Sequence, residues 1–439
     1  MKADVDTAVY RARRARLAAG MKSGVAIVPN APERTRNRDS RYPYRFDSYF
    51  YYLTGFREPE AVLVIVAGAE PRSILFCRDR DPDREIWDGF RYGPDAARGA
   101  FGMDEAHAVE RLDALMPDLI ANRDALYCRI GADAAWDARV MGWVNEVRDR
   151  VRSGVTAPNE VNDVHALLDE MRLIKGPEEV ALMRRAAVIS AGAHQRAMRA
   201  ARPGRAEFEI EAELLHEFRR RGAQAPAYTP IVASGEHACV LHYVQNDGVL
   251  KAGELLLIDA GCEVDGYASD LTRTFPVDGK FTAIQRDLYE LVLGAQAAAI
   301  AQVMPGNAWD APHRAAVRTL ARGFIDLKLL TGSVDEVIET QAYRKFYMHR
   351  TGHWLGLDVH DAGDYKRGGE WRALEPGMVL TVEPGCYIRS GDGVPEQFAG
   401  HGVRIEDDVL VTEAGNEVLT RDAPKAIAEI EAIMSVRDA

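Results

Sequence analysis

The sequence predicts an α+β protein in which a small N-terminal α/β domain precedes a larger C-terminal domain. Residues 1–172 alternate short apolar runs with helical segments, and residues 173–439 repeat a helix, a Pro-Gly pair and a second helix. Strand-like segments that carry acids or histidines follow each helix pair. At 439 residues, 47% hydrophobic and 28% charged, the chain has the length and composition of a globular protein with two domains.

The strands of the N-terminal domain are predicted from the runs GVAIVPN, AVLVIVAG and SILFC. Short apolar runs rich in β-branched residues are typical of buried strands. Residues 105–122 have the pattern of a helix, and EIWDGFRYG, which contains Trp87, is rich in glycine and aromatic residues and predicts a loop. This mixture favours an α/β domain that ends near residue 172.

The C-terminal domain begins with a strong helix signal at Gly176-Pro177. A long amphipathic pattern follows, ends at Pro203-Gly204 and leads into a second helix over residues 206–221. The same order recurs with helices over 282–303 and 311–322. This echo indicates two αα-then-β halves around one cleft, with two unrelated helical hairpins as the alternative.

The stretch ELLLIDAGCEVDGYASDLTRTFP, residues 254–276, predicts a β-hairpin that carries two acids. Asp265-Gly266 is a two-residue turn signal, because both positions tolerate positive φ. In that register Asp259 faces Thr272, and Asp259 and Asp270 share one face at about 7–8 Å. Carboxylates so placed reach cations about 3.5–4 Å apart. The alternative is a pair of ordinary surface acids.

Further residues of metal-ligand type lie in three later segments. These are His349, His353 and His360 in HRTGHWLGLDVHD, Glu383 in LTVEPG, and Glu406 in GVRIEDDVLVT. Glu406 is predicted to lie in the middle of a strand, with Arg404 two residues away on the same face. Two Asp, one His and two Glu form an oxygen-rich donor set that suits a pair of Mn²⁺, Co²⁺, Fe²⁺ or Zn²⁺ ions.

Taken together and in this order, these segments resemble the pita-bread fold metallopeptidases over nearly the whole chain. Within that group, YPYRFDSYFYYLTGFREPEAVL, GHWLGLDVHD and VPEQFAGHGVRIEDDV look like the bacterial Xaa-Pro aminopeptidases, also called aminopeptidase P. The resemblance implies pseudo-twofold αα-β halves around a curved antiparallel sheet. It also implies release of the N-terminal residue from peptides with proline second, by a water or hydroxide that bridges two divalent metals. Prolidase, and a non-catalytic peptide-binding relative, are the alternatives.

The resemblance also implies a role for each donor. Asp259 would bind one metal, His353 and Glu383 would bind the other, and Asp270 and Glu406 would bridge the pair. Mn²⁺ is the first choice of metal, with Co²⁺, Fe²⁺ or Zn²⁺ as alternatives.

Residues around the donors receive roles from the same resemblance. Glu383 would carry a proton to the departing proline nitrogen, and Arg404 would hold Asp259. Trp87 is the candidate to reach the cleft of a neighbouring subunit. Three histidines would line the pocket, orient the substrate and stabilise the oxyanion: His242, His349 and His360.

Composition excludes other classes of function. The formal net charge of −12 argues against a nucleic-acid partner. No apolar run approaches the length of a membrane span, and the N-terminus lacks a signal-peptide pattern. Five cysteines without a CxxC pair fit reduced thiols in the cytoplasm. Peptides with penultimate proline are the expected partners, and the resemblance implies a homodimer or homotetramer.

Overall fold

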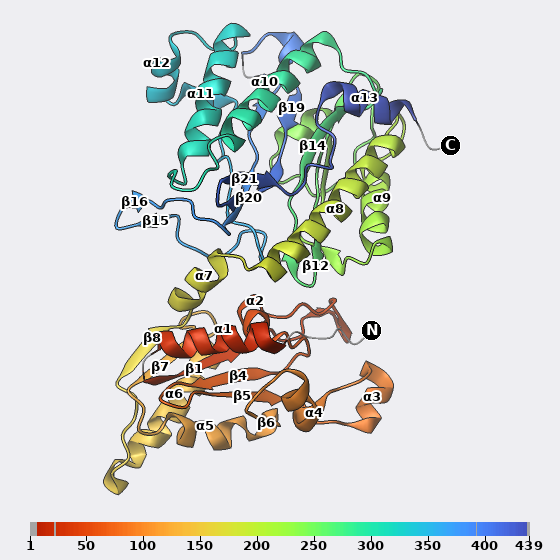
Figure 1. The fold of residues 1–439 in the computed structure, drawn as a ribbon. Coiled ribbons are helices and arrows are strands. Elements are labelled where there is room, and N and C mark those ends of the chain that lie inside the picture. The colour runs from red at the N-terminus through yellow and green to blue at the C-terminus, as the bar shows by residue number, and fades with distance from the viewer. Residues whose placement is uncertain (1–6, 22, 392, 437–439) are drawn as a thin grey trace. The chain divides into compact units, whose positions relative to one another are not determined.

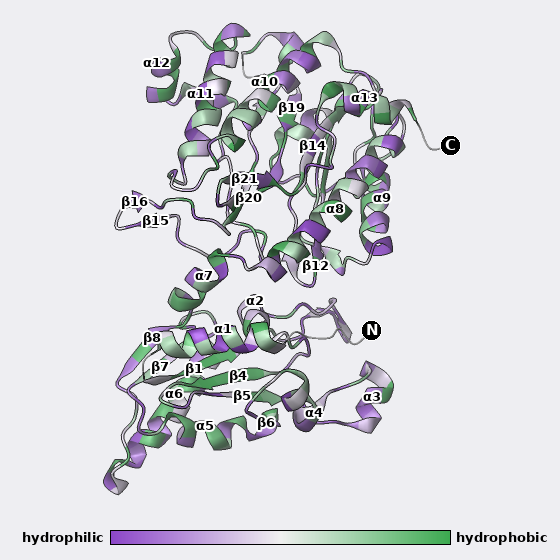
Figure 2. Cartoon of the chain, in the orientation of Figure 1, coloured by the Kyte–Doolittle hydropathy of each residue, from purple (hydrophilic) through white to green (hydrophobic). Residues whose placement is uncertain are grey.

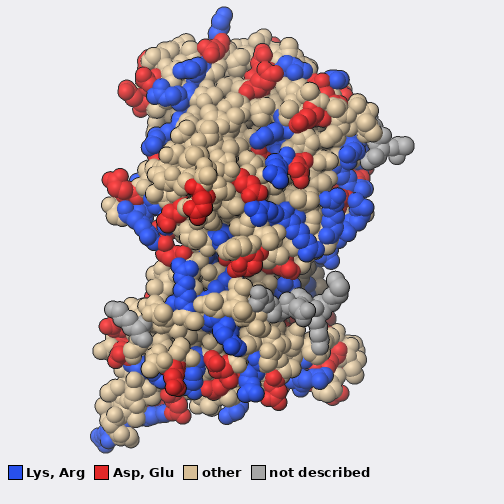
Figure 3. Space-filling view, in the orientation of Figure 1, with Lys and Arg blue, Asp and Glu red and all other residues tan. Residues whose placement is uncertain are grey.

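The computed structural model describes residues 7–21, 23–391 and 393–436. The chain forms two compact units, residues 1–171 and residues 172–439 (Figure 1). Within the described residues, no helix combines the length and the apolar character that spanning a bilayer requires. Figure 3 shows basic and acidic side chains interspersed over the face that it draws.

The N-terminal unit is built on a six-stranded sheet in the order β6-β5-β4-β1-β7-β8. The strands are β1 Gly24–Pro29, β4 Val62–Val66, β5 Arg72–Cys77, β6 Glu105–Ala108, β7 Ala125–Cys128 and β8 Glu160–Asp163. The pairs β1–β4 and β4–β5 are antiparallel and the other pairs are parallel. The central strands are strongly hydrophobic (Figure 2), because both faces of the sheet are covered.

Helices cover the two faces of this sheet. Helix α1 (Thr7–Gly20) lies on one face, and α5 (Leu112–Ile120) and α6 (Ala134–Asp149) lie on the other (Figure 1). Alternate residues of β4, such as Val62 and Val64, pack with α5 and α6 in one apolar cluster. The remaining elements of this unit are β2 Thr35–Asn37, β3 Ser40–Arg41, α2 Ser48–Thr54, α3 Pro82–Asp88 and α4 Gly93–Ala100; α7 spans His165–Leu173.

Two local predictions for this unit are wrong. Residues 105–122 do not form one helix: Glu105–Ala108 is β6, which pairs in parallel with β5, and the α-helix begins at Leu112. The backbone hydrogen bonds available at the sheet edge outweigh the helical pattern there. Trp87 lies on α3 rather than in a loop, because Asp81 accepts hydrogen bonds from the first helical amides.

The C-terminal unit contains the two helical pairs that the Pro-Gly pattern predicts. They are α8 Pro177–Ala200 with α9 Glu207–Arg220, and α10 Ala283–Ile300 with α11 Ala311–Asp326. Thr282 and Gln285 cap α10 reciprocally, as side chains at a helix N-terminus do. Both pairs contribute to one large apolar cluster that also includes β11 and β19 residues. The shorter helices are α12 Val334–Glu339 and α13 Ile427–Ser435.

Two long hairpins in this unit follow the same plan. In the first, β11 (Leu255–Asp259) pairs with β14 (Thr272–Pro276), and β12 (Cys262–Val264) pairs with β13 (Tyr267–Ala268). In the second, β17 (Val379–Val382) pairs with β20 (Asp407–Thr412), and β18 (Gly385–Ile388) pairs with β19 (His401–Arg404). Each hairpin therefore changes sheet part-way along both of its arms. The other strands are β9 Ala225–Pro226, β10 Ile231–Ser234, β15 Lys366–Arg367, β16 Glu370–Trp371 and β21 Gly415–Val418.

The predicted register of the first hairpin is confirmed. Asp259 is the partner of Thr272, and the turn residues Asp265 and Gly266 both have positive φ, 51° and 82°. The arms break at Gly261, where an added Cβ would lie 1.7 Å from the carbonyl oxygen of Ser269. Only glycine permits that approach.

The prediction that Glu406 lies in the middle of a strand is wrong. Strand β19 ends at Arg404 and β20 begins at Asp407, because the chain leaves its pairing with β18 and starts to pair with β17. On the opposite arm the same change of sheet occurs at Glu383-Pro384, where proline has no N–H for a ladder. Glu406 therefore lies at a break between strands.

Candidate metal centre

The four candidate carboxylates all lie where a hairpin arm changes sheet. Asp259 ends β11, and Asp270 lies in the gap between β13 and β14. Glu383 follows β17, and Glu406 lies between β19 and β20. The two hairpins thus supply one carboxylate from each arm, and the breaks free these side chains from the alternation of a regular strand.

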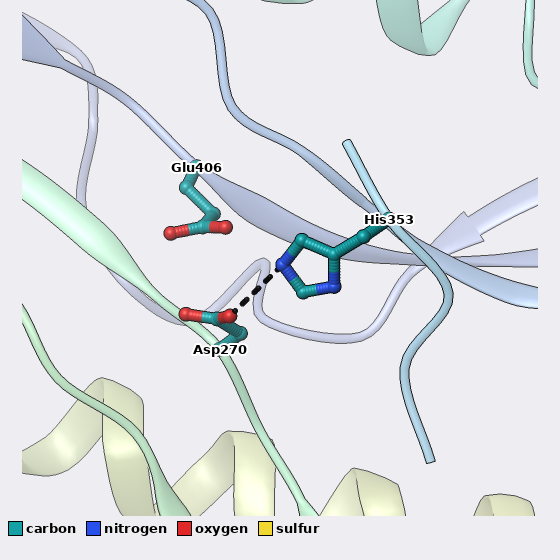
Figure 4. A group of neighbouring side chains, drawn as sticks. All are labelled: Asp270, His353 and Glu406. Carbon is teal, nitrogen blue, oxygen red and sulfur yellow. Dashed lines mark ion pairs between the residues drawn. The ribbon is translucent and has the colours of Figure 1, made fainter. Parts of the chain in front are cut away.

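The centre of the site is a group of three side chains from separate segments. Potential ligand atoms of Asp270, His353 and Glu406 all lie within 4.8 Å of one another. Nε2 of His353 is 3.4 Å from Oδ2 of Asp270. Figure 4 shows the three side chains pointing toward one another. This is a donor set that a divalent cation can bind.

The other two candidate ligands adjoin this group. Oε1 of Glu383 is 3.7 Å from Nε2 of His353. The hydroxyl of Tyr228 lies 2.5 Å from Oδ1 of Asp259 and 2.6 Å from Oδ1 of Asp270. The structure therefore brings all five predicted ligands together.

Tyr228 was not predicted from the sequence. It lies in the loop before β10 and has no pattern that links it to the hairpin acids. The hydroxyl lies between Asp259 and Asp270, but it can donate a hydrogen bond to only one of the two carboxylates at a time.

Arg404 connects both hairpins behind the ligands. Its Nη2 donates to Oδ2 of Asp259 at 2.6 Å, and its Nε donates to Oγ1 of Thr272 at 3.3 Å. Thr272 donates in turn to Oε2 of Glu406 at 2.7 Å. The guanidinium is buried, so these charge-assisted bonds hold the ligand carboxylates firmly.

The electrostatics of the cluster favour bound cations. Burial raises the pKa of Glu406 well above its ordinary value, and the charges of Asp270 and Glu383 raise it further. Burial also raises the pKa of Asp259, against the lowering effect of Arg404. Without cations, such crowded acids would have to take up protons. Oxygen donors with one imidazole fit a pair of divalent ions, and no thiol lies among them.

His353 is oriented for coordination. Its Nδ1 lies 2.9 Å from the carbonyl oxygen of Trp354 and donates to it. That bond fixes the tautomer in which Nε2 faces the carboxylates, as outer hydrogen bonds do for metal-binding histidines. Burial lowers the pKa of His353, but Asp270 and Glu383 outweigh burial and raise it to about 9. Metal binding would have to displace this proton.

The ligands lie in a cavity of about 1050 Å³ in the C-terminal unit. Its wall includes the five ligands, Arg404, Tyr228 and the three predicted histidines, His242, His349 and His360. His242 and His360 are exposed on the wall. The ring of His360 lies 4.3 Å from that of His353.

His349 is already engaged on both ring nitrogens. Nδ1 lies 2.7 Å from the carbonyl oxygen of Arg350, to which it donates, so Nε2 accepts from the Tyr387 hydroxyl at 2.8 Å. Burial and the charge of Arg404 lower the pKa of His349 to about 3, so the ring is neutral. Arg404 also donates to the Tyr387 hydroxyl at 3.0 Å. His349 therefore continues the hydrogen-bonded chain that begins at Asp259.

Trp87 belongs to the N-terminal unit, where its residue is 84% exposed. An exposed tryptophan of this kind has no packing role in its own unit.

Family models match both parts of the chain. The model described as metallopeptidase family M24 matches residues 181–413, and the model described as aminopeptidase P, N-terminal domain, matches residues 10–127. The first match covers more than half of the chain. The chain belongs to metallopeptidase family M24.

Relatives of this M24 enzyme match along its full length. The chain is 47% identical to the Xaa-Pro aminopeptidase of Escherichia coli over 428 residues, 97% of each protein. It is similar to the structure of Pseudomonas aeruginosa aminopeptidase PepP, with a TM-score of 0.97, 52% identity and 98% of each chain covered. A zinc-substituted E. coli aminopeptidase P in complex with product gives a TM-score of 0.97 at 45% identity, with 100% of each chain covered. The fold is therefore the pita-bread fold with an N-terminal domain, as the sequence predicted.

A buried ion cluster holds the M24 histidine loop in place. Asp361 follows His360 and accepts from Nη2 of Arg172 at 2.6 Å and from Nζ of Lys175 at 2.8 Å. All three side chains are 1% exposed. The sequence predicts only a domain boundary near residue 172, whereas in the structure Arg172 and Lys175 also fix the loop that carries His353.

Proposed function

We propose that this enzyme releases the N-terminal residue from peptides whose second residue is proline. The observation that carries the proposal is the convergence of Asp259, Asp270, His353, Glu383 and Glu406 in one cavity of an M24 chain. Relatives that match almost its whole length are named Xaa-Pro aminopeptidase. Its N-terminal domain is of the aminopeptidase P type.

The five ligands would hold two divalent cations. Asp259 would bind one, His353 and Glu383 the other, and Asp270 and Glu406, nearest the centre, would bridge them. Mn²⁺ is the first choice, and Co²⁺, Fe²⁺ and Zn²⁺ suit the same donors. Bound cations would polarise the scissile carbonyl and lower the pKa of water at this site.

Glu383 is the proposed proton carrier. A tertiary proline nitrogen must gain a proton before it leaves, and a carboxylate on the cavity wall can accept a proton from water and pass it on. Burial raises the pKa of Glu383 to about 7 in the metal-free site, and a cation bound beside it would lower that pKa.

The substrate would bind with its free amine beside Asp259. Arg404 and Tyr228 hold that carboxylate in place. An amine bound there would restrict cleavage to the first peptide bond. His242 and His360, exposed on the wall, are placed to contact the substrate and the developing oxyanion. His349 is also proposed to contact the substrate and the oxyanion. Its hydrogen bonds to the Arg350 carbonyl and the Tyr387 hydroxyl fit a residue that positions its neighbours.

The size of the cavity favours peptides over dipeptides. Its volume of about 1050 Å³ lies just above the range of about 300–1,000 Å³ for small-molecule sites. A prolidase needs room for two residues only. We therefore place prolidase second, and a non-catalytic peptide-binding protein third, since no ligand type is missing.

Activity assays on the metal-loaded protein test the proposal. We expect release of alanine from Ala-Pro-Ala-Ala, little from Ala-Ala-Ala-Ala, and loss of turnover with a chelator. Mn²⁺, Co²⁺, Fe²⁺ and Zn²⁺ are then added back in turn. Cleavage of Ala-Pro but not of the longer peptide would identify a prolidase instead. Peptide binding without turnover under every metal would identify a binding protein.

The setting of the enzyme is proposed with the same reasoning. A cytoplasmic protein without nucleic-acid or membrane partners fits the acidic composition and the scattered cysteines. We also propose a homodimer or homotetramer in which Trp87, exposed on α3, reaches the cavity of a neighbouring subunit. Sedimentation of the wild type and of Trp87→Ala, together with their kcat/KM values, tests both points.

A further inference from the structure

The charges on the cavity wall are separated by sign. Among the described residues, every acid on the wall belongs to the ligand set: Asp259, Asp270, Glu383 and Glu406. Arg404 is bound to Asp259 within that set. The other charged residues of the wall are two cations, Arg350 and Lys366. Once four carboxylates are balanced by two divalent ions, the wall beyond the metal centre is positive.

The two cations are brought together by one aromatic ring. Lys366 on β15 is the cross-strand partner of Trp371 on β16, and its Nζ lies over the indole at 4.4 Å from the ring centroid. Arg350 comes from a separate loop, and its Cζ lies 5.2 Å from the same centroid. Cation–π contacts of this geometry hold both side chains at the wall without neutralising them.

Neither cation is neutralised by the part of the chain that the structure describes. Among the residues that the structure describes, no acid forms an ion pair with Arg350 or Lys366. Both residues are exposed, and both line the cavity. An exposed cation on the wall of a substrate cavity attracts an anionic group of the ligand.

We propose that Arg350 and Lys366 bind a carboxylate in the part of the substrate that follows the proline. The inference rests on the proposed function and adds a substrate class, peptides that are anionic beyond their second residue. Two sources supply this chemistry: the C-terminal carboxylate of a tripeptide and an acidic side chain of a longer peptide.

The position of the cations decides which end of the peptide they meet. Arg350, Lys366 and Trp371 belong to the segment that also carries His353 and His360. In the proposed function the amine binds beside Asp259, on the first hairpin, where Tyr228 and Arg404 hold the carboxylate. A peptide with its amine at Asp259 therefore extends past the His353 ligand toward the cationic part of the wall.

A binding measurement and a kinetic measurement test the inference on the metal-loaded enzyme. The binding probes are the dipeptide Pro-Leu and its C-terminal amide. The proposed reaction does not cleave either of them, because no residue precedes the proline. Titration calorimetry is expected to give a dissociation constant about fivefold lower for the free acid, the scale of exposed ion pairs. The preference should shrink in 0.5 M salt.

The kinetic arms separate the two sources of the carboxylate. We expect kcat/KM to be about fivefold higher for Ala-Pro-Leu than for its amide. Among amidated pentapeptides Ala-Pro-Leu-X-Ala, we expect kcat/KM to be higher for the peptide with X = Glu than for the peptide with X = Gln. We expect the peptide with X = Lys to have a lower kcat/KM than the peptide with X = Gln. A preference confined to the tripeptide acid assigns the C-terminal carboxylate, and one confined to the pentapeptides assigns the side chain.

Variants decide whether these two cations are responsible. Arg350→Ala with Lys366→Ala is expected to abolish the acid preference in binding and in kcat/KM, and Lys366→Arg with native Arg350 is expected to retain it. The matched control is Arg367→Ala, a neighbouring cation on β15 outside the cavity wall. A double variant with an undiminished preference, or a native enzyme without one, overturns the inference. Retained binding preference without any turnover overturns the proposed function alone.

Discussion

The two units of this protein build their interiors from different kinds of residue. Among the described residues, every buried acid lies in the C-terminal unit, including Asp270, Asp361 and Glu406. The sheet of the N-terminal unit is buried on both faces by apolar side chains. Arg14 is buried in this unit and donates to the backbone carbonyls of Leu53 and Gly102. These carbonyls, rather than a buried acid, compensate its charge.

This difference separates residues kept for stability from residues kept for chemistry. An apolar core gains free energy from each buried side chain, at about 25 cal/mol per Å². Buried carboxylates cost free energy unless a cation or a hydrogen-bond donor compensates them. The C-terminal unit accepts that cost where the ligands converge, and cations offset it.

The largest effect is expected from Asp270→Ala and Glu406→Ala. Each removes a central carboxylate, so the variants should lose bound metal and more than about 1,000-fold in kcat/KM, about 4 kcal/mol. Without metal, Asp270→Ala should unfold at a lower temperature than the wild type, because it removes the ion-pair partner of His353. Glu406→Ala should change the unfolding temperature less, because burial and the neighbouring acids already favour the protonated form of Glu406.

Metal analysis, activity assays and calorimetry of the metal-free proteins check these outcomes. Asp335→Ala removes an exposed acid of α12 and is the matched control. Full metal content in both ligand variants would contradict the assignment of the centre.

Asp361→Asn tests the ion cluster that holds the histidine loop. The change leaves buried Lys175 without the charge of Asp361 and leaves Arg172 with only the more exposed Asp358, so we expect a loss of about 3–5 kcal/mol in the stability of the C-terminal unit. Urea unfolding followed in that unit measures it, with Asp335→Asn as the control. A loss below about 1 kcal/mol would mean that the loop is held by other contacts.

Much of the site could be predicted because its signals are local. The Asp-Gly turn fixes the register that sets Asp259 opposite Thr272, and the Pro-Gly pairs mark the ends of the helices. Asp259 and Glu383 could be recognised because each stands at the end of an apolar run. The family resemblance implied that the five ligands converge, and in the structure all five line one cavity.

The remainder depends on contacts between distant segments. Tyr228, 31 residues before Asp259, meets it through folding alone. The pairing of Arg172 with Asp361 spans 189 residues. Glu105 was misassigned to a helix because its strand exists only through pairing with β5. Long-range hydrogen bonds leave no periodic pattern in the sequence.

Ile74→Ala tests the apolar interior of the N-terminal unit. Ile74 is fully buried on β5, so a cavity there should cost about 2–5 kcal/mol in the stability of that unit. The metal content of the C-terminal unit should not change. Val161→Ala, at an exposed position of the edge strand β8, is the control. A loss of metal in Ile74→Ala would show that the two interiors are not independent.

The smallest effect on stability, which is absent at neutral pH, is expected from His194 on α8. Its ring is fully buried and Nε2 donates to the carbonyl of Ala260 at 2.9 Å. Burial, with the nearby charge of Arg273, lowers the pKa of His194 from 6.5 to about 4. Between these values the unfolded chain binds a proton that the folded chain excludes. Stability therefore falls as pH falls from 6.5 to 4, by about 3 kcal/mol at most from this residue.

His194→Gln keeps a donor for the Ala260 carbonyl and removes the titrating ring. Its stability should decline less than that of the wild type on acidification, and the two proteins should show the same pH dependence above pH 7. Unfolding in urea at pH 7.5, 6, 5 and 4.5 measures the difference. His216→Gln, at an exposed position on α9, should leave the wild-type profile unchanged. Parallel profiles for the wild type and His194→Gln would place the acid sensitivity of the C-terminal unit in its buried carboxylates instead.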